Sequence, residues 1–337
     1  MGTAIRSTGG KGKGQRRLHA SRWVGWILAL LFAGAVVLAT LHWGDIEKFA
    51  ELSQRAKPAW LAASVILQLL TYIGLSSQWW LVLRQGETPL KFRSLLPITI
   101  SKLFADQVVP TSGMSGNVLL VDRLMARDIP RHNAIAAAIL AIFAYYASFA
   151  ACALAAAILL WLHGNISWLL IGAISIFLLL AAAIPAGILW LQGKGEEAMP
   201  HWLARFGPVR ELFEMVGDAP DELVRNPRLV GQLALLNGAV WVADALTLQA
   251  CLLALGQPVT LDAGFVALII ASIIATIGPV PLGLGSFEAS AIAMLRLMGV
   301  PFEAALSATL LYRGFTLWIP LVAGLIISRG ELKKHGT

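Results

Sequence analysis

The chain of 337 residues is 58% hydrophobic and 13% charged. Soluble domains carry roughly 25% charged residues, so this composition excludes an ordinary soluble globular protein. The net charge of +7 comes from basic residues at the N-terminus and in a few loops, which is typical of orientation signals and not of a nucleic-acid surface. Cys152 and Cys251 lie in apolar runs and the six histidines have no ligand spacing, so neither a disulfide framework nor a metal site or cofactor is predicted.

Six apolar segments are long enough to cross a bilayer, which takes about 20 residues in a helix. In chain order they are 23–43, 59–83, 134–162, 166–191, 229–255 and about 304–327. Tryptophans stand near many of their ends, as expected of indole rings that prefer the membrane interface. The first segment is too long for the core of a signal peptide, so we expect it to be retained as a span.

Two further apolar stretches, 94–121 and 261–298, are interrupted by proline and glycine. The interruptions are Pro110, Gly113 and Gly116 in the first stretch, and Gly278, Pro279, Pro281, Gly283 and Gly285 in the second. Broken backbone at membrane depth is tolerated only where protein or a water-filled cavity satisfies its polar groups. We therefore predict two re-entrant helical hairpins. The alternative is that each stretch forms two short, tightly packed spans.

The two broken stretches share landmarks at one constant spacing, called here the repeat spacing. It separates Pro89, Pro110, Gly116, Met125 and Arg127 from Pro258, Pro279, Gly285, Met294 and Arg296, taken pairwise in that order. Three predicted spans lie between the hairpins, and this odd number makes the second hairpin enter from the opposite face. The order predicts an all-α polytopic membrane protein built as an inverted repeat, with units of about 59–162 and 229–327. This plan is common among secondary transporters.

The charges of the loops predict the orientation. With the N-terminus in the cytoplasm, most basic loops fall inside, whereas loops 163–165 and 256–260 fall outside and carry no Lys or Arg. We therefore expect a protein of the bacterial cytoplasmic membrane with both termini in the cytoplasm. Its parts would be a basic tail over 1–22, a transmembrane domain over 23–328 and a second tail over 329–337.

Ionisable side chains inside apolar segments are rare and usually functional. Glu288 follows the turn formed by Gly283, Gly285 and Ser286, near the start of a half-helix, where a carboxylate gains from the helix dipole. Arg313 lies inside the last predicted span beside Tyr312, and Glu288 is its expected partner. Arg313 would either hold an anionic headgroup or form a purely structural ion pair.

Other polar residues are candidates for the path of a ligand. Asp244 lies within 229–255, where it could bind a cationic group or pair with an arginine. Lys102 and Asp106 stand four residues apart on one half-helix, so they can pair along it or line a cavity. Asn117 follows the first break, and Arg123 is expected near the interface, where a phosphate contact and snorkelling are equally consistent. These residues form no catalytic set, which favours binding and passage over bond breaking.

The second broken stretch resembles a known family. The run from Gly278 to Glu288, followed by Gly299-Val300-Pro301 and Leu311-Tyr312-Arg313, is similar to the signature of the lysylphosphatidylglycerol synthase transmembrane family, also called flippase-like membrane proteins. The resemblance covers roughly residues 20–330. The first hairpin departs from the family pattern, since Asn117 stands where an acid is common and Leu120 where an arginine is frequent. Arg123 is a candidate substitute.

The resemblance implies a domain that moves an amphiphilic lipid between leaflets. In bifunctional members this domain is fused to a soluble aminoacyltransferase, and we expect a member without that second domain, hence no lysyl transfer and no enzymatic activity. The predicted function is a flippase-like transporter of an anionic or aminoacylated lipid, with a lipid-modifying enzyme or a second copy of the chain as candidate partners. The alternatives are a non-transporting lipid-binding accessory protein of an envelope-lipid pathway and a membrane enzyme that acts on a lipid phosphate.

Overall fold

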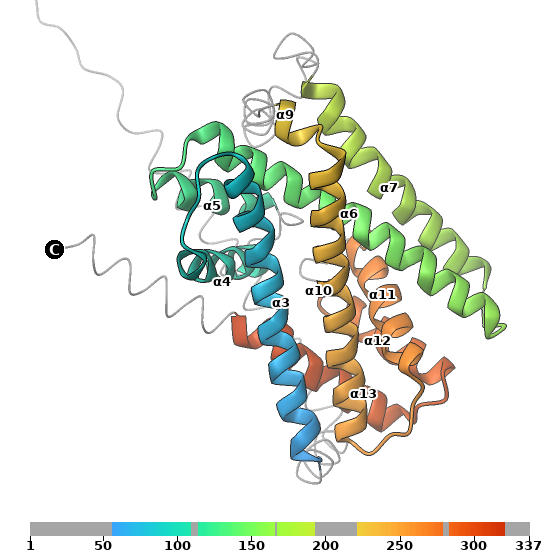
Figure 1. Ribbon diagram of the computed structural model, residues 1–337. Helices are drawn as coiled ribbons and strands as arrows, with labels where there is room; N and C mark the ends of the chain where they lie inside the picture. The colour runs from blue at the N-terminus through green and yellow to red at the C-terminus, as the bar shows by residue number, and fades with distance from the viewer. Residues whose placement is uncertain (1–55, 109–113, 166, 193–220, 279–282, 321–337) are drawn as a thin grey trace, which may run out of the picture. The chain divides into compact units, whose positions relative to one another are not determined.

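The computed structural model describes residues 56–108, 114–165, 167–192, 221–278 and 283–320, and the regular structure in these ranges is entirely helical (Figure 1). Four of the described helices are long and apolar enough to cross a membrane. They are α3 (Pro58–Gln85), α6 (Arg131–Leu162), α7 (Trp168–Gln192) and α10 (Pro227–Ala254). They confirm four of the predicted segments within a few residues. The predicted segment 23–43 and both tails lie outside the described residues.

Each broken stretch forms two helices. The first contains α4 (Phe92–Val108) and α5 (Met114–Met125), and the second contains α11 (Leu261–Ile277) and α12 (Ser286–Leu297). Their lengths of 17 and 12 residues are shorter than a span of about 20. Gly116 was expected to interrupt the first stretch, but it lies inside α5, where helical backbone accommodates it.

The predicted last span differs from a regular helix. α13 (Phe302–Arg313) is followed by a π-helical turn, η3 (Gly314–Trp318). Pro320 has no backbone N–H, so the carbonyl one turn earlier loses its helical donor close to this π-turn. A short helix, α9 (Asp221–Val224), precedes α10. Residues 321–327 of the predicted span lie outside the described part of the chain.

The bounds of the helices follow the repeat spacing of the sequence landmarks. α3 and α10 are both 28 residues long, and both ends of α10 follow those of α3 at this spacing. The same spacing relates both ends of α4 to those of α11. α5 and α12 have equal lengths, but the distance between them along the chain is slightly greater. The two halves therefore share lengths and order over three consecutive helices.

α3 and α10 pack side by side and antiparallel (Figure 1). The N–H of Lys57, just before α3, donates to the carbonyl of Ala254 at the end of α10 over 2.8 Å. Farther along, Nδ2 of Asn237 donates to Oε1 of Gln78 over 3.2 Å, and Oγ of Ser148 on α6 donates to Oδ1 of Asn237 over 3.3 Å. All three side chains are buried. Hydrogen bonds are strong in such an apolar setting, so this network fixes α3, α6 and α10 in register.

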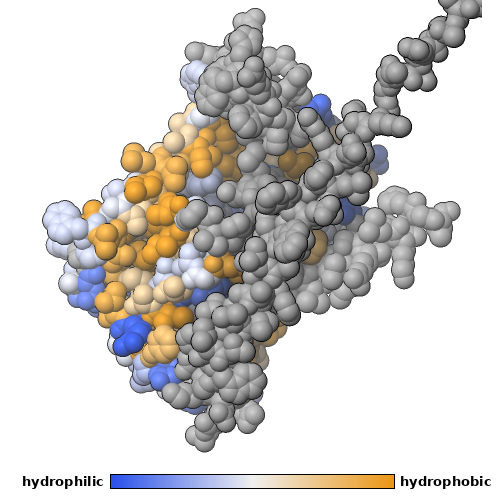
Figure 2. Space-filling model, turned by 180° about the vertical axis from the view of Figure 1, so that it is seen from behind, coloured by the Kyte–Doolittle hydropathy of each residue, from blue (hydrophilic) through white to orange (hydrophobic). Residues whose placement is uncertain are grey.

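The surface of the described helices is apolar where a soluble protein would be polar. α7 is the most hydrophobic of the four long helices, yet only 17% of its most apolar window is buried. Trp168 and Leu169 at its start are 88% and 86% exposed. Hydrophobic side chains gather over one part of the face seen in Figure 2, and hydrophilic ones gather toward its lower edge. Large exposed apolar surface of this kind marks contact with lipid or protein, so the fold is that of a membrane protein.

Candidate functional site

The turn between α11 and α12 requires glycine. Gly283 and Gly285 have φ angles of +61° and +82°, in the left-handed region that other residues avoid. A Cβ at Gly283 would also stand 2.6 Å from Cβ of Ala275 on α11. Ser286, the first residue of α12, donates from Oγ to the carbonyl of Gly283 over 3.1 Å. The chain therefore turns tightly against α11 before α12 begins.

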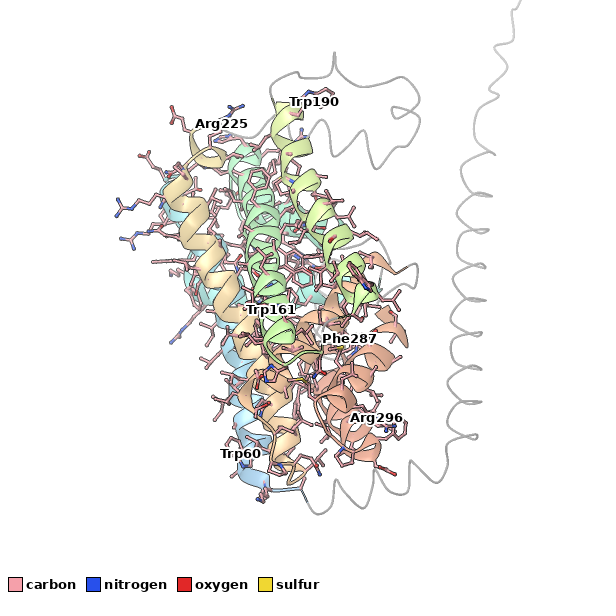
Figure 3. The ribbon with its side chains drawn as sticks, turned by 90° about the vertical axis from the view of Figure 1, so that its right-hand side faces the viewer. Trp60, Trp161, Trp190, Arg225, Phe287 and Arg296 are labelled. Carbon is pink, nitrogen blue, oxygen red and sulfur yellow. The ribbon has the colours of Figure 1, made fainter. Side chains whose placement is uncertain are left out.

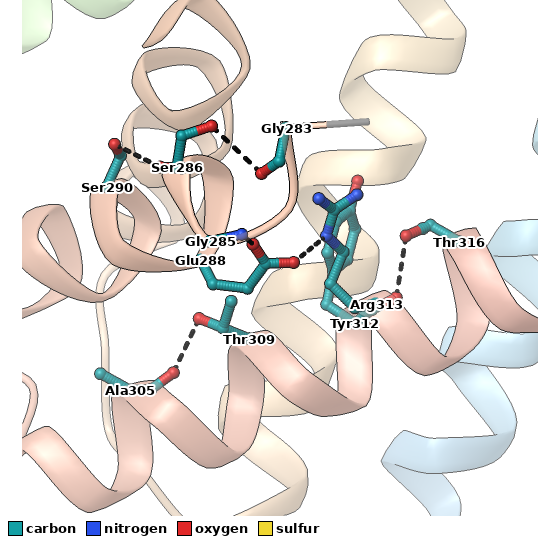
Figure 4. Close-up of polar contacts among 10 residues, drawn as sticks. All are labelled: Gly283, Gly285, Ser286, Glu288, Ser290, Ala305, Thr309, Tyr312, Arg313 and Thr316. Carbon is teal, nitrogen blue, oxygen red and sulfur yellow. Dashed lines mark hydrogen bonds and ion pairs between the residues drawn. The ribbon is translucent and has the colours of Figure 1, made fainter. Parts of the chain in front are cut away.

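Glu288 uses both carboxylate oxygens at this turn (Figure 4). Oε2 accepts a hydrogen bond from the N–H of Gly285 over 2.6 Å, which caps the start of α12. Oε1 accepts from Nε of Arg313 on α13 over 2.6 Å. The pairing expected from the sequence is therefore present, together with the dipole-stabilised position expected for the carboxylate. Because the carboxylate of Glu288 accepts a hydrogen bond from the N–H of Gly285, this donor is already satisfied within the protein.

Aromatic rings support the guanidinium of Arg313. Its Cζ lies 4.3 Å from the centre of the Phe287 ring, a cation–π arrangement. The Phe287 ring stacks on that of Tyr312 with centres 5.9 Å apart and planes 16° apart. Sequence reasoning missed Phe287, although an aromatic residue between Ser286 and Glu288 was a usable signal. The side chain of Arg313 is only 13% exposed, so this support lies in a largely desolvated place.

The break lies between the two ends of the helical bundle. In Figure 3, Trp190 and Arg225 mark one end, Trp60 and Arg296 mark the other, and Phe287 lies between these levels. The π-helical turn η3 follows Arg313 directly, and Oγ1 of Thr316 donates to the carbonyl of Tyr312 over 3.0 Å. Such single π-turns inside helices occur frequently at functional sites.

At the first break, a carboxylate likewise binds both a cation and a glycine N–H. Nζ of Lys102 donates to Oδ2 of Asp106 over 2.7 Å, which is the pairing along α4 that the spacing allows. Oδ1 of Asp106 also accepts from the N–H of Gly116 on α5 over 2.9 Å. Gly116 and Gly285 are repeat counterparts, so each break has a glycine N–H held by a carboxylate that also binds a cation. Sequence reasoning missed this link between α4 and α5, because it depends on how the hairpin closes.

The remaining candidates lie apart from the Glu288–Arg313 pair along the chain. Asn117 is partly buried on α5, and Arg123 is in the last turn of that helix. Asp244 lies on α10, which packs against α13, the helix that carries Tyr312. Within the described ranges, no group of three or more His, Cys, Asp or Glu side chains could hold a metal ion.

These features define a polytopic helical membrane protein with a desolvated Arg–Glu pair at a helix break. The model of the lysylphosphatidylglycerol synthase TM region matches residues 26–324, and the chain belongs to this family. The resemblance found in the sequence is thereby confirmed.

Two similar proteins differ in how much of this chain they match. A phosphatidylglycerol lysyltransferase of Staphylococcus aureus (strain COL) is 31% identical over 127 residues, which is 37% of this chain and 15% of the relative. The same values hold for that protein from Staphylococcus aureus strain N315. A UPF0104 membrane protein of Pyrococcus horikoshii is 20% identical over 324 residues, covering 89% of this chain and 95% of the relative. The match thus spans a small part of the lysyltransferases and nearly all of the UPF0104 protein.

Proposed function

We propose that the protein moves an anionic or aminoacylated lipid between membrane leaflets, and that the headgroup passes the break between α11 and α12. The observation that carries the proposal is the Arg313–Glu288 pair at a glycine turn between the ends of the bundle. Its place would be the cytoplasmic membrane, with lipid as the ligand. The name of the lysyltransferase relatives supports a lipid of the phosphatidylglycerol class as the first substrate to test.

The energetics of the pair favour a functional role. Burying an ion pair costs about as much in desolvation as it returns in Coulombic attraction, so such a pair is a poor way to stabilise a fold. A guanidinium, in contrast, matches the geometry of a phosphate oxygen pair. A lipid phosphate could replace Glu288 as the partner of Arg313. Glu288 would then restore the balance of charge after the headgroup leaves.

The attachment of the two hairpins supports access from both sides. The hairpin of α4 and α5 connects the end of α3 to the start of α6, where Nδ2 of Asn133 donates to the carbonyl of Gly86 over 2.8 Å. The hairpin of α11 and α12 follows the end of α10, which the Lys57–Ala254 hydrogen bond holds beside the start of α3. The two hairpins therefore join opposite ends of the α3–α10 pair. This arrangement favours re-entrant hairpins in an inverted repeat, as in transporters with alternating access.

Movement of a labelled lipid tests the proposal directly. The full chain is reconstituted into phosphatidylglycerol vesicles that contain fluorescent phosphatidylglycerol, and the label exposed outside is quenched over time. We expect the protein-dependent rate of lipid movement to fall at least about tenfold in Arg313→Ala, which corresponds to a barrier higher by roughly 1.4 kcal/mol. The matched control is Arg296→Ala, which removes an exposed arginine from α12.

Two outcomes would exclude this function. Protein-free and protein-containing vesicles that move the label equally would leave only a lipid-binding role. A new lipid product detected by mass spectrometry would instead identify an enzyme. Equal rates for Arg313→Ala and Arg296→Ala would refute the role assigned to Arg313.

A further inference from the structure

Asp244 is a partly buried carboxylate to which no described residue supplies a counter-charge. It lies on α10, in the second half of that helix. Within the described residues, Oδ1 is buried and has no hydrogen-bond partner, and no cation forms an ion pair with this side chain. The repeat counterpart of Asp244 on α3 is Leu75. The acid is therefore present in the second repeat unit and not at the equivalent position of the first.

Phenol and indole groups lie on α10 and on the helices packed against it. The ring of Tyr145 on α6 has its centre 5.8 Å from that of Trp241 on α10, and Tyr72 on α3 and Tyr312 on α13 are buried on helices that contact α10. The hydroxyl of Tyr72 and Nε1 of Trp241, one turn before Asp244, are also buried without a hydrogen-bond partner in the described part of the chain. Tyr72 and Trp241 are themselves counterparts at the repeat spacing. Tyr72 on α3, and Trp241 and Asp244 on α10, thus each carry a polar atom without a hydrogen-bond partner in the described part of the chain.

The remaining helix packed against α10 brings no cation to this region. The ionisable side chain of α11 is Asp262 in its first turn, and its Oδ2 lies 3.2 Å from Nε2 of His163. Arg313 binds Glu288. Phenols can donate hydrogen bonds to a carboxylate, but they do not neutralise it. An isolated carboxylate in a low-dielectric setting costs many kcal/mol and is normally neutralised by a proton.

We propose that Asp244 is a proton-binding site that couples lipid movement to a proton gradient. Water on one side of the membrane supplies the proton, the Asp244 carboxylate becomes a carboxylic acid, and the proton is released to water on the other side. No covalent bond of the lipid is broken in this cycle. The inference rests on the proposed function, because it names the ion that accompanies the lipid.

Aromatic contacts on α13, which packs against α10, lead to the headgroup site. Tyr312 precedes Arg313 in the sequence, and its ring stacks on Phe287. The face of Phe287 in turn supports the guanidinium of Arg313. Neutralising Asp244 removes a negative charge beside the helix that carries Arg313. The occupancy of one site therefore changes the electrostatic setting of the other, as coupling between two ligands requires.

Infrared difference spectroscopy tests proton binding without any transport. The reconstituted full chain is titrated with acid, and the carbonyl band of a protonated carboxylic acid is followed. We expect a band that is lost in Asp244→Asn and kept in Asp262→Asn, the matched control on α11. A spectrum with the same bands in the unmodified protein and in Asp244→Asn would overturn the proposal.

Vesicles with imposed gradients test the coupling. With one proton for each lipid, a gradient of one pH unit shifts the leaflet ratio of fluorescent phosphatidylglycerol by about tenfold at a clamped membrane potential. We expect no shift in Asp244→Asn and the full shift in Asp262→Asn. A response to a sodium gradient and not to a pH gradient would overturn the proposal. Complete absence of lipid movement in the unmodified protein would refute the proposed function, while the infrared titration would still decide proton binding.

Discussion

The turn at Gly283 offers a sharp test of how the second break is built. Gly283→Ala places a residue with a side chain at a φ of +61°. This conformation costs about 1–2 kcal/mol for a residue other than glycine. The new methyl group would also lie 2.6 Å from Cβ of Ala275, and such overpacking costs about 1–3 kcal/mol. Together the two effects predict a loss of about 2–5 kcal/mol in the free energy of unfolding.

Two further variants separate these effects. Gly285→Ala also requires a positive φ, +82°, but with a ψ of −43°, which lies outside the left-handed helical basin, and its Cβ would meet no atom within 4 Å. Its loss should therefore be conformational only, and larger than the about 1–2 kcal/mol of that basin. Ala275→Gly removes the methyl group that Gly283→Ala would strike. The double variant of positions 275 and 283 should recover the packing part, which gives a coupling energy of about 1–3 kcal/mol.

Unfolding in mixed detergent micelles, followed by helical circular dichroism, measures these free energies. The same samples serve for the labelled-lipid assay, in which Gly283→Ala should slow movement because it displaces the turn that seats Glu288. A double-mutant cycle of positions 275 and 283 without coupling would refute the packing argument, because it would show that the methyl groups do not meet.

Three further perturbations address the polar contacts. Glu288→Gln leaves the Arg313 guanidinium without its counter-charge and should lower the free energy of unfolding by about 3–5 kcal/mol in unfolding titrations. The double variant with Arg313→Gln should regain most of this free energy of unfolding but should not move labelled lipid. A double variant that moves lipid normally would contradict the role assigned to the pair. Gly116→Ala would drive its methyl group into the Asp106 carboxylate, so this change and Asp106→Asn should be non-additive in the free energy of unfolding; additive losses would show that the contact is not shared. Asn237→Leu removes the residue that joins three helices and should lower the free energy of unfolding by about 1–3 kcal/mol, whereas an unchanged transition would show that the network contributes little.

Features that depend on local sequence were predictable to within a few residues. The expected span 59–83 corresponds to α3 (Pro58–Gln85), because length and uninterrupted hydrophobicity define a spanning helix directly. The second break was placed correctly because Gly283 and Gly285 leave the helical region by their own conformational preference. The repeat spacing of the landmarks also reappears in the helix bounds. The orientation of the repeat remains a prediction.

Features that depend on tertiary distance could not be predicted in the same way. The contact of Asp106 with Gly116 exists because α4 and α5 pack as a hairpin, and no spacing rule brings these positions together. The Phe287 ring supports Arg313 only because α12 and α13 pack against each other. The pairing of Glu288 with Arg313 was an exception. In a segment this apolar, few opposite charges are available, so the choice of partner was narrow.

At each break, one carboxylate accepts a hydrogen bond from a glycine N–H at equivalent positions of the repeat, but the cation that pairs with it comes from a different place. This difference affects how each hairpin can move. At the first break, Asp106 and its cation Lys102 belong to the same hairpin. That hairpin can shift against its neighbours with the ion pair intact. At the second break, the cation comes from α13, outside the hairpin, so any separation of α13 from α12 must break the Arg313–Glu288 pair. Under the proposed function, a lipid phosphate that replaced Glu288 would compensate for this loss, and opening of the second break would then depend on the presence of a headgroup.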